Sequence, residues 1–299
     1  MNTNRITTPA ERLPYSAIID RPPLPRPDGA RIIVWPIVNV EHWDITRPMP
    51  RQILPAPTGV THTPDVPNWA WHEYGMRVGF WRLKRALDAL DIVPTLSING
   101  MVCNSYPRVA RAAADAGWEF MGHGYTQMPT HAVDDQAAMI AKTVETIHGF
   151  TGEAPCGWLG PGLTETLESV DLLHAAGIRY IGDWVLDDEP CRLRTRGGPM
   201  VAMPYSVELN DVTVMAVQHH RSEEFLIRIR DSFDRLYAEG EERLRIMGIA
   251  VHPFLSGVPH RIKYLEQALA YIKGHSNVRF MTGRQILEWY DQSVPVHKE

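Results

Sequence analysis

ADAGWEF (residues 114–120) reads as the last turn of a helix, a glycine, and the start of a strand. The glycine stands where the residue after a helix commonly takes a positive φ, which glycine adopts without steric cost. HAAGIRY (174–180) repeats this pattern, and HSNVRF (275–280) repeats it with asparagine in the same place. Helix-to-strand turns of one kind, recurring along the chain, predict repeated helix and strand units around a parallel sheet.

Short apolar runs alternate with amphipathic stretches on both sides of these turns, beginning with RIIVWPIV (31–38). Strands are expected at 31–38, 93–98, 118–121, 155–159, 178–182, 200–203, 212–216, 245–251 and 278–281. Helices are expected at 76–90, 105–116, 134–149, 164–176, 222–239, 260–274 and 283–291. About seven or eight such units predict an α/β barrel, whose chemistry lies at the carboxyl ends of its strands.

The first thirty residues differ in composition from the rest. They contain DRPPLPRPDG (20–29), and proline can neither continue a helix nor fill a central strand. We therefore expect an extended N-terminal arm over residues 1–30, suited to a surface or oligomer contact. Residues 31–299 are expected to form a single catalytic barrel domain.

The bulk composition argues against several classes of partner. The formal net charge is −5, and no lysine- or arginine-rich run supplies a local basic patch, so nucleic acid and anionic membranes are not expected partners. No run of about 18 apolar residues predicts a membrane span. The polar N-terminus lacks the apolar core of a signal peptide, and the three cysteines show no CxxC spacing. We expect a cytoplasmic protein with neither a disulfide framework nor a thiolate zinc site.

Polar and aromatic residues follow many of the expected strands. Glu41 and His123 form the sharpest pair, because a carboxylate and an imidazole at neighbouring strand ends can divide acid and base roles or share a metal. The glycines in GHGYTQM (122–128) predict a close approach of a ligand or a neighbouring strand to that backbone. His252 begins a loop after the apolar strand expected at 245–251.

The long irregular stretch 41–75 follows the first expected strand and suits a loop that covers the substrate. Tryptophans in the expected rim segments would supply flat apolar walls for a ring-shaped ligand, although at least two are expected only to pack. These are Trp43, Trp69, Trp71, Trp158 and Trp184.

These motifs resemble the polysaccharide deacetylase superfamily over roughly residues 30–292. HEYGMRVGFWRLKRALD (72–88), HGYTQM (123–128) and MPYSVELND (203–211) are most similar to its cytoplasmic branch of metal-independent allantoinases and cyclic-imide hydrolases. The resemblance implies a distorted (β/α)7 barrel, a hydrolase, and a homo-oligomer.

The superfamily's usual signature supplies a carboxylate after the first strand and two histidines after the third, which together hold a divalent metal. Here Asn39 or Glu41 takes the first place, and Gln127 stands where the second histidine would be. Glutamine is a poor zinc ligand, so no metal site is expected, and a zinc ion held weakly by Glu41 and His123 is the alternative. By the same resemblance, His252 falls where the superfamily keeps a catalytic histidine.

The favoured hypothesis is hydrolysis of a carbon–nitrogen bond in a small cyclic amide, imide or ureide. Glu41 or His123 would activate water, and His252 would protonate the leaving nitrogen. Gln127 would match the ring's N–H and C=O edge. The substrate-binding residues are expected to be Asn39, Gln127, Trp158, Asp183 and Trp184.

Two other functions remain open. One is a metal-dependent N-deacetylase of an N-acetylated sugar or polysaccharide, with a role in carbohydrate metabolism. The other is a barrel that binds a small molecule without turning it over.

Overall fold

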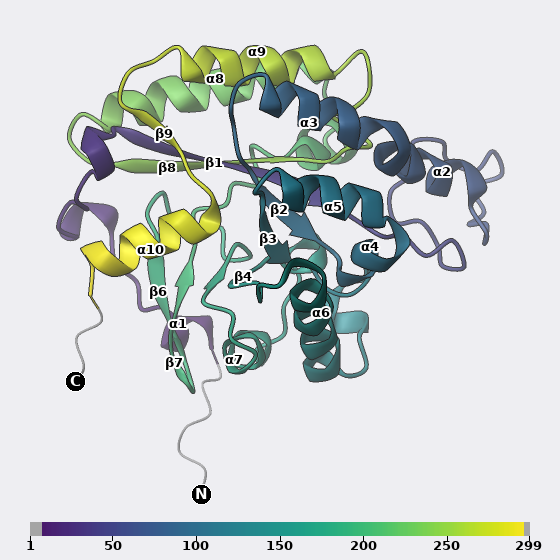
Figure 1. Ribbon diagram of the computed structural model, residues 1–299, viewed down its shortest axis with the longest axis horizontal. Helices are drawn as coiled ribbons and strands as arrows, with labels where there is room; N and C mark the ends of the chain where they lie inside the picture. Colours follow the sequence, from purple (N-terminus) through teal and green to yellow (C-terminus); the bar gives the residue numbers. More distant parts are fainter. Residues whose placement is uncertain (1–7, 296–299) are drawn as a thin grey trace, which may run out of the picture.

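The computed structural model describes residues 8–295, in which a curled sheet is surrounded by helices (Figure 1). The strand order is β6-β7-β5-β4-β3-β2-β1-β8, and β9 also pairs with β1. The strands are β1 (Ile32–Val40), β2 (Thr95–Ile98), β3 (Glu119–Gly122), β4 (Gly157–Trp158), β5 (Tyr180–Ile181), β6 (Cys191–Thr195), β7 (Gly198–Ala202), β8 (Arg245–Val251) and β9 (Val278–Phe280). The described pairs are parallel apart from the β6–β7 hairpin. This half-barrel confirms the expected distorted (β/α) barrel.

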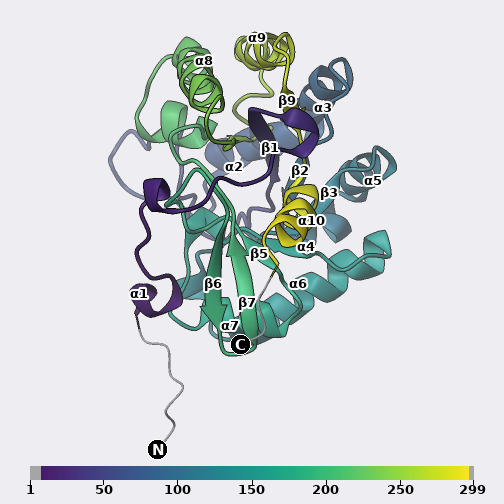
Figure 2. The ribbon, with the colours of Figure 1, turned by 90° about the vertical axis from the view of Figure 1, so that its left-hand side faces the viewer.

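Helices lie along the outside of the sheet, with α3, α8 and α9 over β1 and β8 (Figures 1 and 2). The α-helices are α1 (Pro9–Arg12), α2 (Val66–Tyr74), α3 (Phe80–Asp88), α4 (Gly100–Ser105), α5 (Pro107–Asp115), α6 (Gln136–Thr151), α7 (Ser169–Ala175), α8 (Ser222–Glu239), α9 (Ile262–Lys273) and α10 (Gly283–Ser293). The π-helical segments are η3 (Gly75–Gly79) and η6 (Val212–Val217). The 3-10 segments are η1 (Ile18–Asp20), η2 (Pro27–Gly29), η4 (Thr130–Ala132) and η5 (Pro161–Leu163). No helix within residues 8–295 combines the length and hydropathy that a membrane crossing needs.

The helix-to-strand turns are confirmed. Gly117 and Gly177 have φ angles of 71° and 90°, and Asn277 has 57°. Each turn feeds the following strand, β3, β5 or β9, into the sheet.

The central strand β1 directs its residues alternately to the two faces of the sheet. Val34 and Val38 pack with the surrounding helices, whereas Trp35 and Ile37 pack inside the barrel. Because side chains alternate along a strand, Asn39 shares the inner face with Trp35 and Ile37, and Glu41 follows it at the barrel mouth. The whole of β1 is buried, as expected for a parallel strand covered on both faces.

The strand expected at 212–216 is wrong, because this run forms the π-helix η6. Asn210 makes a single parallel bridge to Ala250 beside β8, and the chain then turns into the helix at Asp211. Burial of Val212, among other apolar residues of the run, outweighs the β preference of its branched side chains. The turn leaves Asp211 close to the end of β8.

The proposed arm is described from residue 8 onward, and its first seven residues lie outside the described range. Arg12 in α1 is 2% exposed and forms an ion pair with Asp171 of α7 at 2.8 Å. Arg21 pairs with Asp187 at 2.9 Å in the segment before β6. These contacts attach the segment to the barrel on the side of β5–β7.

Candidate active site

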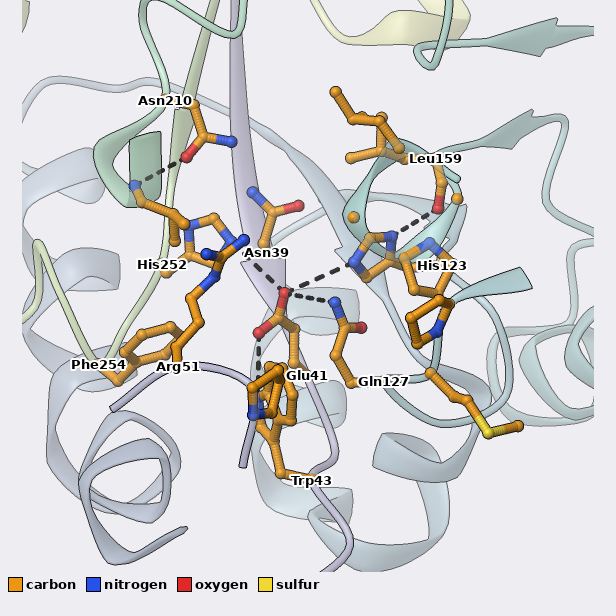
Figure 3. Close-up of a pocket in the computed structure, with 18 of the residues that line it drawn as sticks. Asn39, Glu41, Trp43, Arg51, His123, Gln127, Leu159, Asn210, His252 and Phe254 are labelled. Atoms are coloured by element: carbon orange, nitrogen blue, oxygen red, sulfur yellow. Dashed lines mark hydrogen bonds and ion pairs between the residues drawn. The ribbon is translucent and has the colours of Figure 1, made fainter. Parts of the chain in front are cut away.

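A cavity of about 210 Å³ opens at the carboxyl ends of β1, β3 and β8 (Figure 3). Its wall combines ionisable, amide and aromatic side chains from segments far apart in the chain. Among them are Asn39, Glu41, Trp43, Arg51, His123, Gln127, Tyr205, Asn210, His252 and Phe254.

Glu41 lies at the centre of this group and is 8% exposed. Its Oε1 atom accepts a hydrogen bond from Gln127 Nε2 at 2.9 Å, and its Oε2 accepts one from Trp43 Nε1 at 3.1 Å. The same Oε1 lies 3.6 Å from His123 Nε2 and 3.4 Å from His252 Nε2. Burial alone would raise the pKa of Glu41, but the charge of His252 holds that pKa well below its usual range. The carboxylate is therefore ionised at neutral pH.

His252 is supported from behind by Asp211. Its Nδ1 lies 2.6 Å from Asp211 Oδ1, and its backbone N–H donates to Asp211 Oδ2 at 2.8 Å. Ser256 Oγ also donates to Oδ2, at 2.6 Å, so both carboxylate oxygens are engaged. Burial lowers the pKa of His252, but the charges of Asp211 and Glu41 outweigh it and raise that pKa to about 9. His252 is therefore protonated at neutral pH.

His123 faces Glu41 with a fixed tautomer. Its Nδ1 lies 2.5 Å from the carbonyl oxygen of Leu159, which can only accept, so Nδ1 carries a proton. The backbone N–H of His123 donates to the carbonyl of Ile98 at 3.0 Å, and Asn99 Nδ2 donates to the backbone carbonyl of His123. In the neutral ring, Nε2 then presents a lone pair toward Glu41.

The glycines around His123 serve packing and turning. A Cβ on Gly122 would lie 2.6 Å from the ring of Trp158. Gly124 has a φ of 70°, and a Cβ there would lie 2.9 Å from Pro161. The close approach expected at this backbone is therefore made by the Trp158 ring, which holds His123 against β4.

The loop that carries His252 presses against η3. A Cβ on Gly79 would lie 2.0 Å from the carbonyl oxygen of Pro253, and one on Gly75 would lie 2.7 Å from the backbone nitrogen of Phe254. The missing side chains allow the helix and the loop to touch backbone to backbone. π-Helical turns occur frequently at functional sites.

Gln127 orients Glu41. It donates to the carboxylate, while its own Oε1 accepts from Asn99 Nδ2 at 3.1 Å. Asn39 lies in the same wall and is 2% exposed. Both amides expected to bind substrate thus reach the pocket, but the carbonyl end of Gln127 is engaged inside the protein.

Three of the expected substrate-binding residues lie outside this pocket. Trp158 is 2% exposed and packs in the core. Asp183 accepts a hydrogen bond from the backbone N–H of Gly160 at 2.7 Å and faces Glu165, and Trp184 donates to Glu165 at 2.8 Å. Asp183 and Trp184 instead line a second cavity, so the expectation that these three line the ligand site is corrected.

The expected aromatic rim is reduced to one tryptophan. Trp43 lines the pocket, whereas Trp69 donates to the Trp43 carbonyl at 3.1 Å. Trp71 packs edge-on against Phe254 at 4.9 Å between ring centroids. The covering stretch is also shorter than expected, because Asp65 caps α2 and the helix begins at Val66.

The donor set does not fit a divalent metal. The amide of Gln127, a hydrogen-bond donor, contacts the Glu41 oxygen that also faces both imidazoles. Within residues 8–295, no group of three or more His, Cys, Asp or Glu side chains is disposed to hold a metal ion.

Asp211 and Arg51 are among the residues of this site that were missed in the sequence. Asp211 ends the MPYSVELND stretch, but the strand expected just after it hid its proximity to His252. Arg51 lies within the covering stretch, with no local pattern to distinguish it from other surface arginines.

Known proteins resemble this chain along most of its length, although no protein-family model matches it. A candidate polysaccharide deacetylase from Schizosaccharomyces pombe is 28% identical over 244 residues, covering 75% of this chain and 76% of that protein. The peptidoglycan deacetylase of Helicobacter pylori is 23% identical over 258 residues, covering 74% of this chain and 86% of that protein.

Two solved structures share the fold at 26% identity. A candidate polysaccharide deacetylase from Pseudomonas aeruginosa superposes with a TM-score of 0.84, covering 93% of this chain and 97% of that one. PuuE allantoinase superposes with a TM-score of 0.83, covering 92% of this chain and 95% of that one.

Proposed function

Within the polysaccharide deacetylase superfamily, to which this chain belongs as a hydrolase of non-peptide carbon–nitrogen bonds, we propose that it opens a small cyclic amide, imide or ureide ring. The observation that carries the proposal is the arrangement of Glu41 between His123 and His252, with Gln127 on the same oxygen. One group is already ionised and another already protonated at neutral pH, as a base and an acid must be.

The size of the pocket supports a small substrate. Sites for drug-sized ligands enclose about 300–1,000 Å³, whereas this cavity is about 210 Å³. A single ring suits that volume better than an extended sugar polymer. The structural similarity to an allantoinase, an enzyme of a cyclic ureide, points the same way.

The base side of the site is formed by Glu41 and His123. We assign His123 Nε2 as an acceptor, because Nδ1 carries the ring proton; it lies 3.6 Å from Glu41 Oε1, so one water can bridge the two atoms. One water that donates to both would keep a lone pair for the carbonyl carbon. We assign Glu41 as the proton acceptor and His123 as the group that orients the water.

The acid side of the site is His252. Asp211 holds its ring and keeps its pKa about 9, so Nε2 carries a proton at neutral pH. That proton passes to the ring nitrogen when the carbon–nitrogen bond breaks. Asn39 lines the pocket beside Glu41; its Nδ2 donates one hydrogen to the Val251 carbonyl at 3.4 Å, and we assign its second hydrogen to the developing oxyanion.

The atoms balance without another reactant. Water oxygen bonds to the carbonyl carbon, one water proton goes to Glu41, and the carbon–nitrogen bond releases a nitrogen that takes the His252 proton. Proton return from Glu41 to His252 restores both groups. The product is a linear amide or ureide bearing a new carboxyl group.

We propose that this reaction proceeds without a resident metal. The superfamily usually uses one, but Gln127 replaces an imidazole ligand with an amide donor in this chain. General acid–base catalysis raises a reaction rate by about 10²–10⁴-fold, and an oxyanion donor raises it by about 10²–10³-fold. A site without a metal can therefore catalyse the reaction.

Deacetylation of an N-acetylated sugar is the second candidate, favoured by the names of the sequence relatives. A panel of hydantoin, succinimide, allantoin, N-acetylglucosamine and its oligomers separates the two. We expect turnover of at least one ring and none of the sugars; release of acetate from the sugars alone would overturn the proposal.

We further propose a cytoplasmic homo-oligomer that acts on a small molecule. Tyr15 and Ile19 on the arm are 93% and 85% exposed, which supports a contact with another copy. The three cysteines are free thiols, consistent with a reducing compartment. Light scattering would find a mass above that of one chain; a monomer at micromolar concentration would contradict the oligomer.

A further inference from the structure

Arg51 is a half-buried cation in the wall of the pocket. It belongs to the covering stretch and lines the cavity together with Glu41, His252 and Phe254. Figure 3 shows its side chain rising past Phe254, with the guanidinium on the His252 side in that view. Within residues 8–295, no hydrogen bond or ion pair to this guanidinium is found.

Several other half-buried arginines of the chain are paired with carboxylates. Arg21 contacts Asp187 at 2.9 Å, and Arg243 contacts Glu189 at 2.9 Å. A cation removed from water without a partner is costly, so proteins normally supply an opposite charge. Unlike Arg21 and Arg243, Arg51 faces a cavity and not a carboxylate.

The Glu41 carboxylate does not serve as that partner. Its oxygens are engaged by Gln127, Trp43 and the two imidazoles, of which His252 already supplies a positive charge. The nearby walls formed by Trp43, Met128 and Phe254 are largely apolar, which strengthens any charge–charge contact formed inside. The positive charge of Arg51 is therefore available to a ligand.

The backbone next to Arg51 is held in place. Asn68 in α2 is 1% exposed, and its Oδ1 accepts hydrogen bonds from the backbone of Ile53 at 2.9 Å and Leu54 at 3.1 Å. Its Nδ2 donates to the Leu54 carbonyl at 2.9 Å, and Met49 on the other side is 4% exposed. A buried amide and a buried methionine thus fix both ends of the short segment that carries Arg51.

We infer that Arg51 binds a carboxylate on the substrate, so that the preferred substrate is a cyclic amide or ureide with an acidic substituent. The planar guanidinium fork matches the two oxygens of a carboxylate. The inference deepens the proposed ring hydrolysis and rests on it.

The test uses two rings that differ only by an acidic arm, hydantoin and hydantoin-5-acetate. We expect kcat/KM of the unchanged protein to be at least about 10-fold higher for the acid. Arg51→Gln is expected to lower kcat/KM for the acid about 10–100-fold and for hydantoin less than about threefold, because a hydrogen bond to a charged group is lost. Arg51→Lys should recover part of the loss. Arg77→Gln, on an exposed position of η3, makes the same charge change as a control.

Equal losses on both rings would make Arg51 an oxyanion donor and overturn the inference, as would equal rates for both rings in the unchanged protein. If neither ring is opened, the proposed function fails, and calorimetric binding still decides the inference. Binding of hydantoin-5-acetate that weakens about 10–100-fold in Arg51→Gln supports it; binding unaffected by that substitution, or absent from both proteins, refutes it.

Discussion

Glu41 and Asp183 are both carboxylic acids that follow strands of one sheet, and both are 8% exposed. Their neighbours differ. Glu41 meets two imidazoles, an amide and an indole N–H, and its pKa is well below the usual range despite burial. Asp183 meets the carboxyl of Glu165, and burial together with that second acid raises its pKa well above the usual range. Equal burial thus gives one acid whose pKa is held low and one whose pKa is raised, according to the charges that each carboxyl group faces.

The same contrast explains which functional residues the sequence could reveal. Glu41, His123 and His252 were expected together because parallel strands end at a common rim, and their contacts are 3.4 and 3.6 Å. The roles given to them stay proposals. Asp183 also follows a strand, but its carboxyl partner Glu165 lies in another loop, so nothing local indicated that its pKa would be raised.

The largest expected effect comes from removing the charge of Glu41. Glu41→Gln should lower kcat on the ring substrate about 10²–10⁴-fold, because the proton acceptor is lost. Asp183→Asn, the matched change at the other acid, should leave kcat within about threefold. Steady-state kinetics on both variants, with circular dichroism to verify folding, makes the comparison; a comparable loss in Asp183→Asn would break it.

The next effect concerns the pH dependence of His252. Its pKa is about 9, and it must be protonated to act, so kcat/KM should fall as pH rises through about 9. Asp211→Asn removes a negative charge that raises this pKa, so the fall should move to lower pH and the rate at pH 8 should drop. An alkaline limb that stays in place in Asp211→Asn would show that Asp211 does not set the acid.

The missed role of Asp211 has a physical origin. A β-branched run at 212–216 predicts a strand, and a strand would have carried Asp211 along the sheet edge. Tertiary packing made the run helical and turned Asp211 toward His252. The helix-to-strand turns, by contrast, depend on local signals such as Gly117, which is why they were predictable.

A smaller effect is expected from the contact between η3 and the His252 loop. Gly79→Ala would place a Cβ 2.0 Å from the Pro253 carbonyl, displacing that loop. We expect kcat to fall about 10-fold and stability to fall by about 1–3 kcal/mol. Gly149→Ala is the control, since a Cβ there meets nothing within 4 Å; it should leave activity unchanged and raise stability by up to about 1 kcal/mol. Equal behaviour of the two variants in urea melts and kinetics would refute the packing argument.

The smallest effect is on stability at the Asp183 site. The folded-state pKa of Asp183 is raised above its ordinary value of 3.8, so the stability it confers is full below that pH and is lost as pH rises through the folded pKa. Asp183 and Glu165 lie together with three other groups around them. Trp184 N–H donates to Glu165, Gly160 N–H donates to Asp183, and the charge of Arg12 lowers the pKa of Glu165. In Asp183→Asn, the side-chain oxygen can still accept from the Gly160 N–H, and the side-chain NH₂ can donate to Glu165. The side chain no longer titrates. Asp183→Asn should therefore melt about 2–4 °C above the unchanged protein at pH 9 and by less at pH 5. A melting difference that shrinks toward pH 9 would contradict a raised pKa of Asp183.

The most direct measurement is the rate of ring opening by protein exhaustively treated with chelator, with its metal content determined by elemental analysis. A site made of Glu41, His123 and His252 with Gln127 predicts an unchanged kcat at far less than one metal ion per chain. Activity that disappears with the chelator and returns with stoichiometric zinc would contradict it.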